Sequence, residues 1–165
     1  TSINDITRSS NIAKGTFYTY FKDKNDLIYQ IAKKEQIISF QSFITTAKEH
    51  LCTCDHTWCH EVGVLMIDEF FEHPDFLRFI YQSMLAGYLP KYSNLLNYSQ
   101  HIPILEEFLV SCKKPEDTLE QTAHKLTIVY QMVTFSCFSA HYINMYEDKE
   151  QAKQYIREHT LGLLN

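Results

Sequence analysis

Glycine and proline are scarce in this chain of 165 residues, which contains four of each. Because these two residues mark most turns and interrupt regular structure, their scarcity indicates long regular segments joined by short connections. No run of alternating apolar and polar residues is long enough to predict a strand. The composition and the periodicity therefore predict an all-α fold.

Long apolar runs are absent too, since no segment approaches the ~20 residues that span a bilayer. The first residues lack the charged, apolar and small segments of a signal peptide. Five cysteines, an odd number, fit reduced thiols better than a secreted disulfide framework. We therefore expect a soluble, cytoplasmic protein.

Catalytic signatures are missing as well. The sequence contains no pattern of a catalytic triad, no phosphate-binding loop and no metal-binding helix motif. The acidic run Asp68, Glu69 and Glu72 has no partner base, so we interpret it as a solvated helix face rather than as a pair of catalytic carboxylates. We expect neither enzyme activity nor a cofactor.

The charge is unevenly distributed along the chain. Residues 1–50 hold seven Lys or Arg against five Asp or Glu, a net charge of +2, whereas residues 51–165 hold eight against fifteen, a net charge of −7. This asymmetry is expected when one end of a protein meets phosphate groups and the rest repels them. The charge distribution therefore favours residues 1–50 as the part of the chain that contacts nucleic acid.

Residues 1–24 have the pattern of two short helices joined by a sharp turn. Thr1 is an N-cap type of residue, and Ile3 and Ile6 then fall on one face, which predicts a first helix over residues 2–9.

The turn and the second helix follow directly. Asn11 accepts the left-handed backbone that a sharp reversal needs, and Ile12 is expected to plug the turn. A second helix begins near Ala13, whose side chain cannot cap it, and Phe17 and Phe21 share one face of this helix. Its other face is basic, hydroxyl-bearing and aromatic, which suits a DNA groove: Lys14, Thr16, Tyr18, Thr19 and Tyr20.

These residues closely resemble the DNA-binding signature of the TetR family of bacterial repressors. The residues that carry the resemblance are Asp5-Ile6, Asn11-Ile12-Ala13, the run Lys14-Gly15-Thr16-Phe17-Tyr18-Thr19-Tyr20-Phe21, and then Lys24 and Leu27. The resemblance implies a helix-turn-helix whose second helix reads DNA. It places the DNA contacts at Thr1, Lys14, Gly15, Thr16, Tyr18, Thr19, Tyr20 and Lys24. Without it, the same spacing would fit two helices of an ordinary bundle.

The sequence departs from the family pattern in two places. Family members usually have Gly at the position of Asn11 and Ser or Thr at the position of Ala13. They also carry one more helix ahead of the helix-turn-helix, so we expect a front helix to precede Thr1.

A long helix is expected from about Lys24 to about His50, after an N-cap at Asp23. At 1.5 Å per residue it would extend roughly 40 Å and connect two lobes. The resemblance implies the same: residues 1–24 form the DNA-binding region, and this helix transmits the switch from an effector-binding and dimerisation domain over residues 25–165. We predict that its buried stripe consists of Leu27, Ile31, Ile38 and Phe43.

A cluster of thiols and imidazoles follows the long helix. Its members are Cys52, Cys54, His56, Cys59 and His60. Structural zinc sites favour ligand pairs with two to four residues between them, and this spacing fits poorly. We favour a connection between helices in which Asp55 caps the next helix and Trp58 packs inward, so we expect no metal.

Further helices are expected over residues 57–72, from Pro74 to about Gly87, and over residues 104–112. The segment 87–103 is rich in loop-forming residues and aromatics, which makes it a possible gate to a ligand cavity.

Two C-terminal helices complete the expected fold, one beginning at Pro115-Glu116-Asp117 and one at Glu147-Asp148-Lys149. The first is apolar on two sides and must bury both. One stripe is Leu119, Ala123, Leu126, Tyr130, Val133, Cys137 and Ala140. The other is Ile128, Met132, Phe135, Phe138 and Tyr142. The resemblance implies that these two helices form a homodimer, which would place two reading helices on a palindromic operator.

Eleven Tyr, eleven Phe and one Trp make an aromatic cavity plausible. By helix face and neighbourhood, we predict that its walls are Trp58, Met66, Phe70, Phe79, Met84, Tyr88, Tyr130, Phe135, Phe138, His141 and Tyr142. A small, largely apolar or aromatic effector would fit.

The sequence thus predicts a TetR-like transcriptional regulator, a repressor that an effector relieves. Two alternatives stay open. One is a helical ligand-binding protein without a DNA role, and the other is a regulator that responds to metal or thiol chemistry through residues 52–60.

Overall fold

The computed structural model describes residues 1–50, 57–87 and 93–164. Within these ranges every regular element is a helix, so the all-α prediction is confirmed. The helices are α1 (Ile3–Ser9), α2 (Lys14–Tyr20), α3 (Lys24–His50), α4 (Trp58–Glu72), α5 (Pro74–Leu85), α6 (Ser93–Ser99), α7 (Pro103–Cys112), α8 (Leu119–Tyr142), α9 (Lys149–Thr160) and the 3₁₀ helix η1 (Leu161–Leu164).

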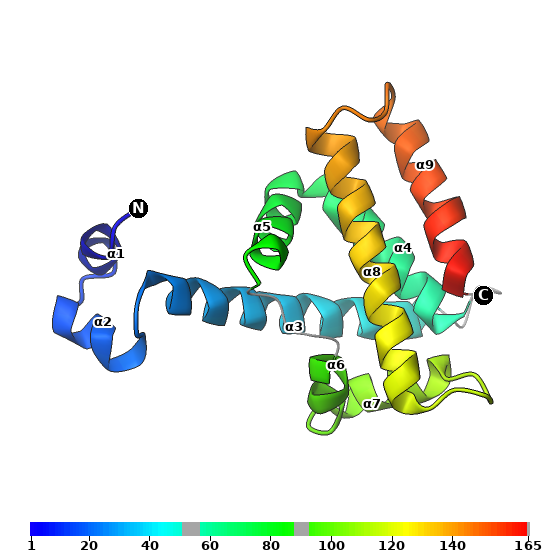
Figure 1. The fold of residues 1–165 in the computed structure, drawn as a ribbon, viewed down its shortest axis with the longest axis horizontal. Coiled ribbons are helices and arrows are strands. Elements are labelled where there is room, and N and C mark those ends of the chain that lie inside the picture. The colour runs from blue at the N-terminus through cyan, green and yellow to red at the C-terminus, as the bar shows by residue number, and fades with distance from the viewer. Residues whose placement is uncertain (51–56, 88–92, 165) are drawn as a thin grey trace.

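The molecule has two lobes of unequal size (Figure 1). The pair α1 and α2 lies at one end, and α3 runs from this pair into a larger group made of the other helices. None of the helices in the described ranges has both the length and the apolar character required to cross a membrane.

In the first lobe, two expectations from the sequence are wrong and one is confirmed. Ser2, not Thr1, caps α1, because its side chain accepts from the backbone N–H of Asp5 while the Asp5 carboxylate accepts from the N–H of Ser2. Asn11 has a φ of 53°, so the predicted left-handed turn is confirmed. Ile12 is exposed and plugs nothing within the described chain.

The long helix α3 contains 27 residues, and its buried face agrees with the predicted stripe only in part, since Leu27 and Phe43 are half-buried. Ile31 and Ile38 are 43% and 49% exposed, whereas Ala32, Ile44 and Ala47 are fully buried. Both sets recur at helical spacing. The face that packs is decided by the neighbours of α3, namely α4, α5 and α7, which the spacing within one helix cannot reveal.

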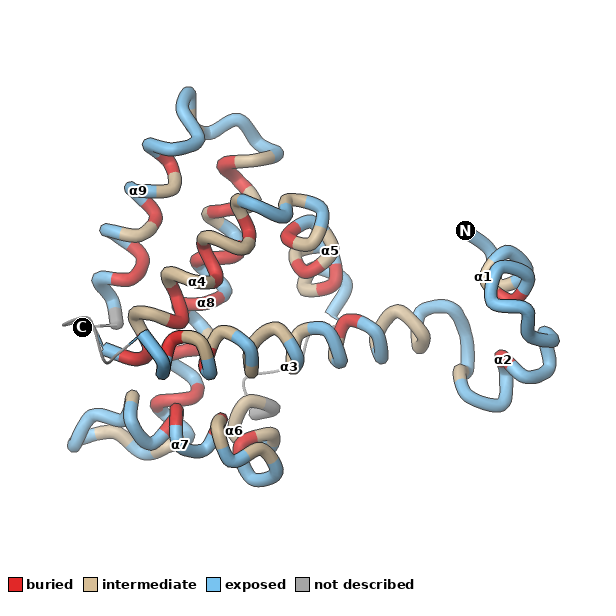
Figure 2. Tube along the Cα trace, turned by 180° about the vertical axis from the view of Figure 1, so that it is seen from behind, coloured by how far each residue is buried: buried red, intermediate tan, exposed pale blue. Residues whose placement is uncertain are grey.

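The centre of the larger lobe lies where α4 and α8 pack together, with α3, α5, α7 and α9 around them. In Figure 2 the buried positions gather along the helices of this lobe, whereas α1 and α2 are almost entirely exposed. Trp58 is part of this core, and its indole N–H donates to the Ile44 carbonyl at 2.9 Å. The hydroxyl of Thr57 caps α4. Asp55, the expected cap, lies outside the described residues.

Helix α8 starts later than predicted. Thr118 and Gln121 form a capping box at its beginning, so Pro115 lies before the helix. Its first stripe is buried apart from the half-buried Leu119, as predicted. The second stripe is exposed at Ile128, Met132, Phe135 and Tyr142.

Helix α9 begins where predicted, directly after Asp148, whose side chain caps it. It is held against α4 by Asp68, whose carboxylate pairs with Lys153 at 2.7 Å and also with Arg157. Asp68 is therefore not part of a solvated acidic face. Leu161 is buried against Gly63, where an added Cβ would lie 2.3 Å from the Leu161 side chain.

Candidate functional site

Helix α2 presents nearly all of its surface to solvent. Of its seven residues only Phe17 is buried, at 1% exposure. The Phe17 ring packs against Phe21, with ring centroids 5.3 Å apart, and against Tyr18 at 5.4 Å. These contacts fix the inner side of α2. The exposed residues are Lys14, Gly15, Thr16, Tyr18, Thr19 and Tyr20.

Gly15 lies in the first turn of α2 in an open environment. A Cβ added there would meet no atom of the described chain within 4 Å. Glycine inside a helix costs roughly 0.5–1 kcal/mol relative to alanine. Packing within the described chain therefore does not explain this glycine, whereas close approach of another molecule's backbone would.

The junction between α2 and α3 is fixed by short-range hydrogen bonds. The Asp23 carboxylate accepts from the N–H of Asp26 at 2.9 Å, and the Asp26 carboxylate accepts from the N–H of Lys22 at 2.9 Å. Lys24, the first residue of α3, is exposed, and its Nζ donates to the Thr1 carbonyl at 3.3 Å. The junction thus places Lys24 beside the start of α1.

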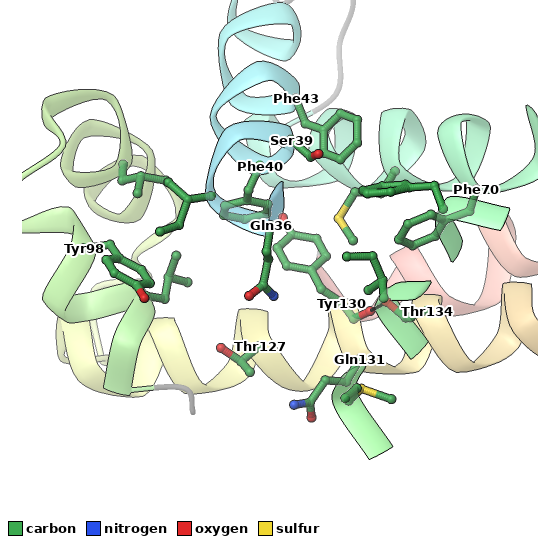
Figure 3. A pocket seen from close by; sticks show the side chains of 17 residues that line it. Gln36, Ser39, Phe40, Phe43, Phe70, Tyr98, Thr127, Tyr130, Gln131 and Thr134 are labelled. Carbon is green, nitrogen blue, oxygen red and sulfur yellow. Dashed lines mark hydrogen bonds between the residues drawn. The ribbon is translucent and has the colours of Figure 1, made fainter. Parts of the chain in front are cut away.

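The larger lobe encloses a cavity of about 140 Å³ (Figure 3). Helices α3 to α8 all contribute to its wall. The apolar part consists of Ile37, Phe40, Phe43, Met66, Phe70, Phe76, Ile80, Met84, Leu95 and Leu105. The polar part consists of Gln36, Ser39, Tyr98, Thr127, Tyr130, Gln131 and Thr134.

Four of the predicted wall residues line this cavity, namely Met66, Phe70, Met84 and Tyr130. Tyr88 lies outside the described residues. The other predicted residues do not line it: Trp58, Phe79, Phe135, Phe138, His141 and Tyr142.

Several of these residues are held elsewhere by contacts of their own. Phe138 stacks on Tyr81 with ring centroids 3.9 Å apart. The Tyr142 hydroxyl donates to the Pro74 carbonyl at 2.8 Å. The His141 ring packs on Phe71, and partial burial lowers its pKa.

Sequence reasoning missed the contribution of α3 to the cavity. Gln36, Phe40 and Phe43 line it at spacings of four and three residues, which place them on one face of the helix. That spacing was the available signal. The predicted buried stripe of this helix includes Phe43 but neither Gln36 nor Phe40, so the predicted role of α3 is that of a connector alone.

Three hydroxyl protons of the cavity wall are engaged by backbone carbonyls. Thr127 donates to Ala123 at 2.8 Å, and Thr134 donates to Tyr130 at 2.8 Å. The Tyr130 hydroxyl donates to the Cys59 carbonyl at 3.2 Å, and burial raises its pKa.

The predicted thiol and imidazole cluster is only partly visible, because Cys52, Cys54 and His56 lie outside the described residues. Elsewhere along the described chain, no three His, Cys, Asp or Glu residues gather closely enough to hold a metal ion.

Cys59 pairs instead with Cys112 of α7. A hydrogen bond from the Cys112 thiol, opposed by burial and aided by the Thr57 hydroxyl, lowers the pKa of Cys59 to about 6. The same hydrogen bond, together with burial, raises the pKa of Cys112.

Comparison with known proteins gives one match. Residues 1–31, which contain α1, α2 and the start of α3, match the family described as bacterial regulatory proteins, tetR family. Neither the curated proteins nor the solved structures give a match to the chain.

Proposed function

Residues 1–31 match the TetR family of bacterial regulatory proteins, and on that premise we propose that the chain is a TetR-like repressor whose DNA binding is relieved by a small molecule in the cavity. The family places it among DNA-binding transcriptional regulators. The repressor role, the effector and the dimer are the further parts of this proposal.

The observation that carries the DNA-binding role is the exposed surface of α2. Its Lys14 ammonium suits a phosphate, while Thr16, Tyr18 and Tyr20 offer hydroxyls and rings to phosphates and base edges. Lys24 would contact a phosphate next to this surface. Gly15 would let the DNA backbone approach closely.

The effector role rests on the position of α3. Five of its residues line the cavity, and the same helix continues to the DNA-reading lobe (Figure 1). A ligand that binds one position of α3 better than another shifts the population towards that position. In our proposal this shift moves the reading helix out of register with its DNA site.

A homodimer is supported by the exposed apolar stripe of α8. Ile128, Met132 and Phe135 lie along one side of this helix and are 46%, 44% and 47% exposed, although the Phe135 ring also meets Tyr81 of α5. Pairing through α8 and α9 about a two-fold axis would set two reading helices about 34 Å apart on a palindromic operator.

The test is DNA binding by the full-length protein to its own upstream region, and to duplexes selected from a random pool, across a salt series. We expect a palindromic footprint and a steep fall in affinity with salt. Lys14→Ala should weaken binding and reduce the salt slope by about one unit, because one phosphate contact is lost.

Lys113→Ala is the matched control, since Lys113 is also an exposed lysine and directly follows α7 in the larger lobe. If Lys14→Ala binds as tightly as Lys113→Ala at the same salt concentration, α2 is not the reading helix. If the protein shows no sequence preference, either for its own upstream region or among the random duplexes, it is not a repressor.

A further inference from the structure

We propose that the cavity selects neutral, single-ring ligands that carry an O–H or N–H donor, and that the side-chain oxygen of Gln36 accepts this hydrogen bond. The inference deepens the proposed effector site and rests on it. Size, charge and hydrogen-bonding capacity of the wall support it separately.

The size of the cavity suits the burial of about one ring. The cavity measures about 140 Å³. A protein cavity of roughly 150 Å³ with an apolar lining admits benzene, whereas drug-sized ligands occupy roughly 300 Å³ or more. The aromatic walls Phe40, Phe70 and Tyr130 suit a flat ring.

Charge restricts the ligand further. None of the described residues that line the cavity carries a charged side chain. Moving an ionised group from water into this space would cost several kcal/mol without an opposite charge to offset the loss. A neutral ligand is therefore favoured over its carboxylate or ammonium counterpart.

Hydrogen bonding decides the polarity of the ligand. The oxygen Oε1 of Gln36 is buried, and no donor in the described chain reaches it. Figure 3 shows this side chain extending from α3 beside Phe40 towards Thr127. The hydroxyls of Thr127, Tyr130 and Thr134 already donate to backbone carbonyls, so they do not supply a proton to Gln36. The Gln36 oxygen is therefore a buried acceptor that the described wall leaves without a donor.

A ligand O–H or N–H would supply the donor that this oxygen lacks. A buried acceptor without a partner is costly, and a donor on the ligand removes that cost while satisfying itself. An apolar ring of the same size fills the same space but leaves the Gln36 oxygen without a hydrogen-bond donor. The preference for a donor should therefore depend on the Gln36 side chain.

Phenol and toluene are the matched probes, because both carry one ring and one substituent of similar size. Their dissociation constants are measured by calorimetry for the unaltered protein, Gln36→Leu and Gln36→Met. Both substitutions should shift the phenol-to-toluene ratio against phenol by about tenfold, which corresponds to the loss of one buried hydrogen bond. Gln41→Leu, on the same helix but away from the cavity wall, should leave the ratio unchanged.

The outcomes separate this inference from the proposed function. If the ratio is the same in all variants, or if benzoate binds more tightly than phenol, the inference fails and the effector site still stands. If the unaltered protein binds operator DNA but neither phenol nor toluene, the cavity is not an effector site for such rings, and both the inference and the proposed relief by such ligands fail.

Discussion

The hydroxyl of Tyr130 donates to the backbone carbonyl of Cys59 at 3.2 Å and so ties α8 to the first turn of α4. The two residues are 71 positions apart in sequence. Tyr130 also lines the cavity, and its ring packs edge-on against Phe40 of α3. One side chain thus joins three helices around the proposed effector site.

Removing this hydroxyl should weaken the larger lobe without emptying its core. Tyr130→Phe keeps the ring but leaves the Cys59 carbonyl with one hydrogen bond fewer, so the free energy of unfolding should fall by about 1 kcal/mol. Urea denaturation measures the change. Tyr155→Phe, at an exposed tyrosine of α9, is the control and should not alter stability. Equal stability of the two variants would mean that the Tyr130 hydrogen bond contributes nothing.

Cys59 should make stability depend on pH. Its pKa is lowered from 9.0 to about 6, so between these values the folded state releases a proton that the unfolded state keeps. The free energy of unfolding should therefore rise from pH 6 to pH 9, and this contribution should disappear as the pH falls through about 6. The raised pKa of Cys112 acts only above this window.

The pH effect is checked by urea denaturation of Cys59→Ala, whose stability should rise less between pH 6 and pH 9. Cys137→Ala serves as the control, because burial raises the pKa of Cys137 to about 12 and its ionisation lies outside the window. If the two variants have parallel stability curves, Cys59 does not ionise in the folded protein at neutral pH.

The ion pairs of Asp68 should matter more than those at the surface. Asp68→Ala leaves Lys153 and Arg157 of α9 without their partner in a partly buried position, and we expect a loss of about 1 kcal/mol that shrinks at high salt. Asp75→Ala breaks an exposed pair with Arg78 and should change stability little. Thermal denaturation at two salt concentrations compares them, and equal losses would contradict the prediction.

Gly15→Ala should separate folding from DNA binding. Alanine favours the helix and meets no described atom, so stability should be kept or slightly increased. The added methyl group should obstruct approach of the DNA backbone and lower operator affinity by about tenfold. Gly162→Ala is the control, because its site is equally open but lies at the other end of the chain. Unchanged operator affinity in Gly15→Ala would remove Gly15 from the DNA interface.

Phe135→Glu should separate the protomers of the proposed dimer. The substitution places a charge on the exposed stripe of α8 and leaves the inner face of that helix intact. We expect light scattering to show half the mass at the same concentration, with the helical circular dichroism retained. Val110→Glu introduces the same charge at an exposed apolar residue of α7 and should leave the mass unchanged. A dimer that persists in Phe135→Glu would place the interface elsewhere.

The helices themselves were predictable because their signals are local. Phe17 and Phe21 are four residues apart, and this spacing alone indicates which side of α2 packs and which side faces outward. Asn11 indicates a turn because asparagine tolerates a left-handed backbone, and Asp148 indicates a helix start because its side chain can cap one. Where several residues compete for a cap, as Thr1 and Ser2 do, the choice depends on a neighbour three positions on, here Asp5.

The sequence by itself determined the all-α fold, the helix-turn-helix and the resemblance of residues 1–31 to the tetR family, because these follow from short-range spacing and residue type. Only the tertiary structure decided which side of α3 is buried, which aromatics meet at the cavity and where Gln36 lies. Those outcomes depend on helices that are distant in sequence, such as α3 and α8. The spacing of apolar residues in one helix shows that a face is apolar, but it does not show which other helix will cover that face.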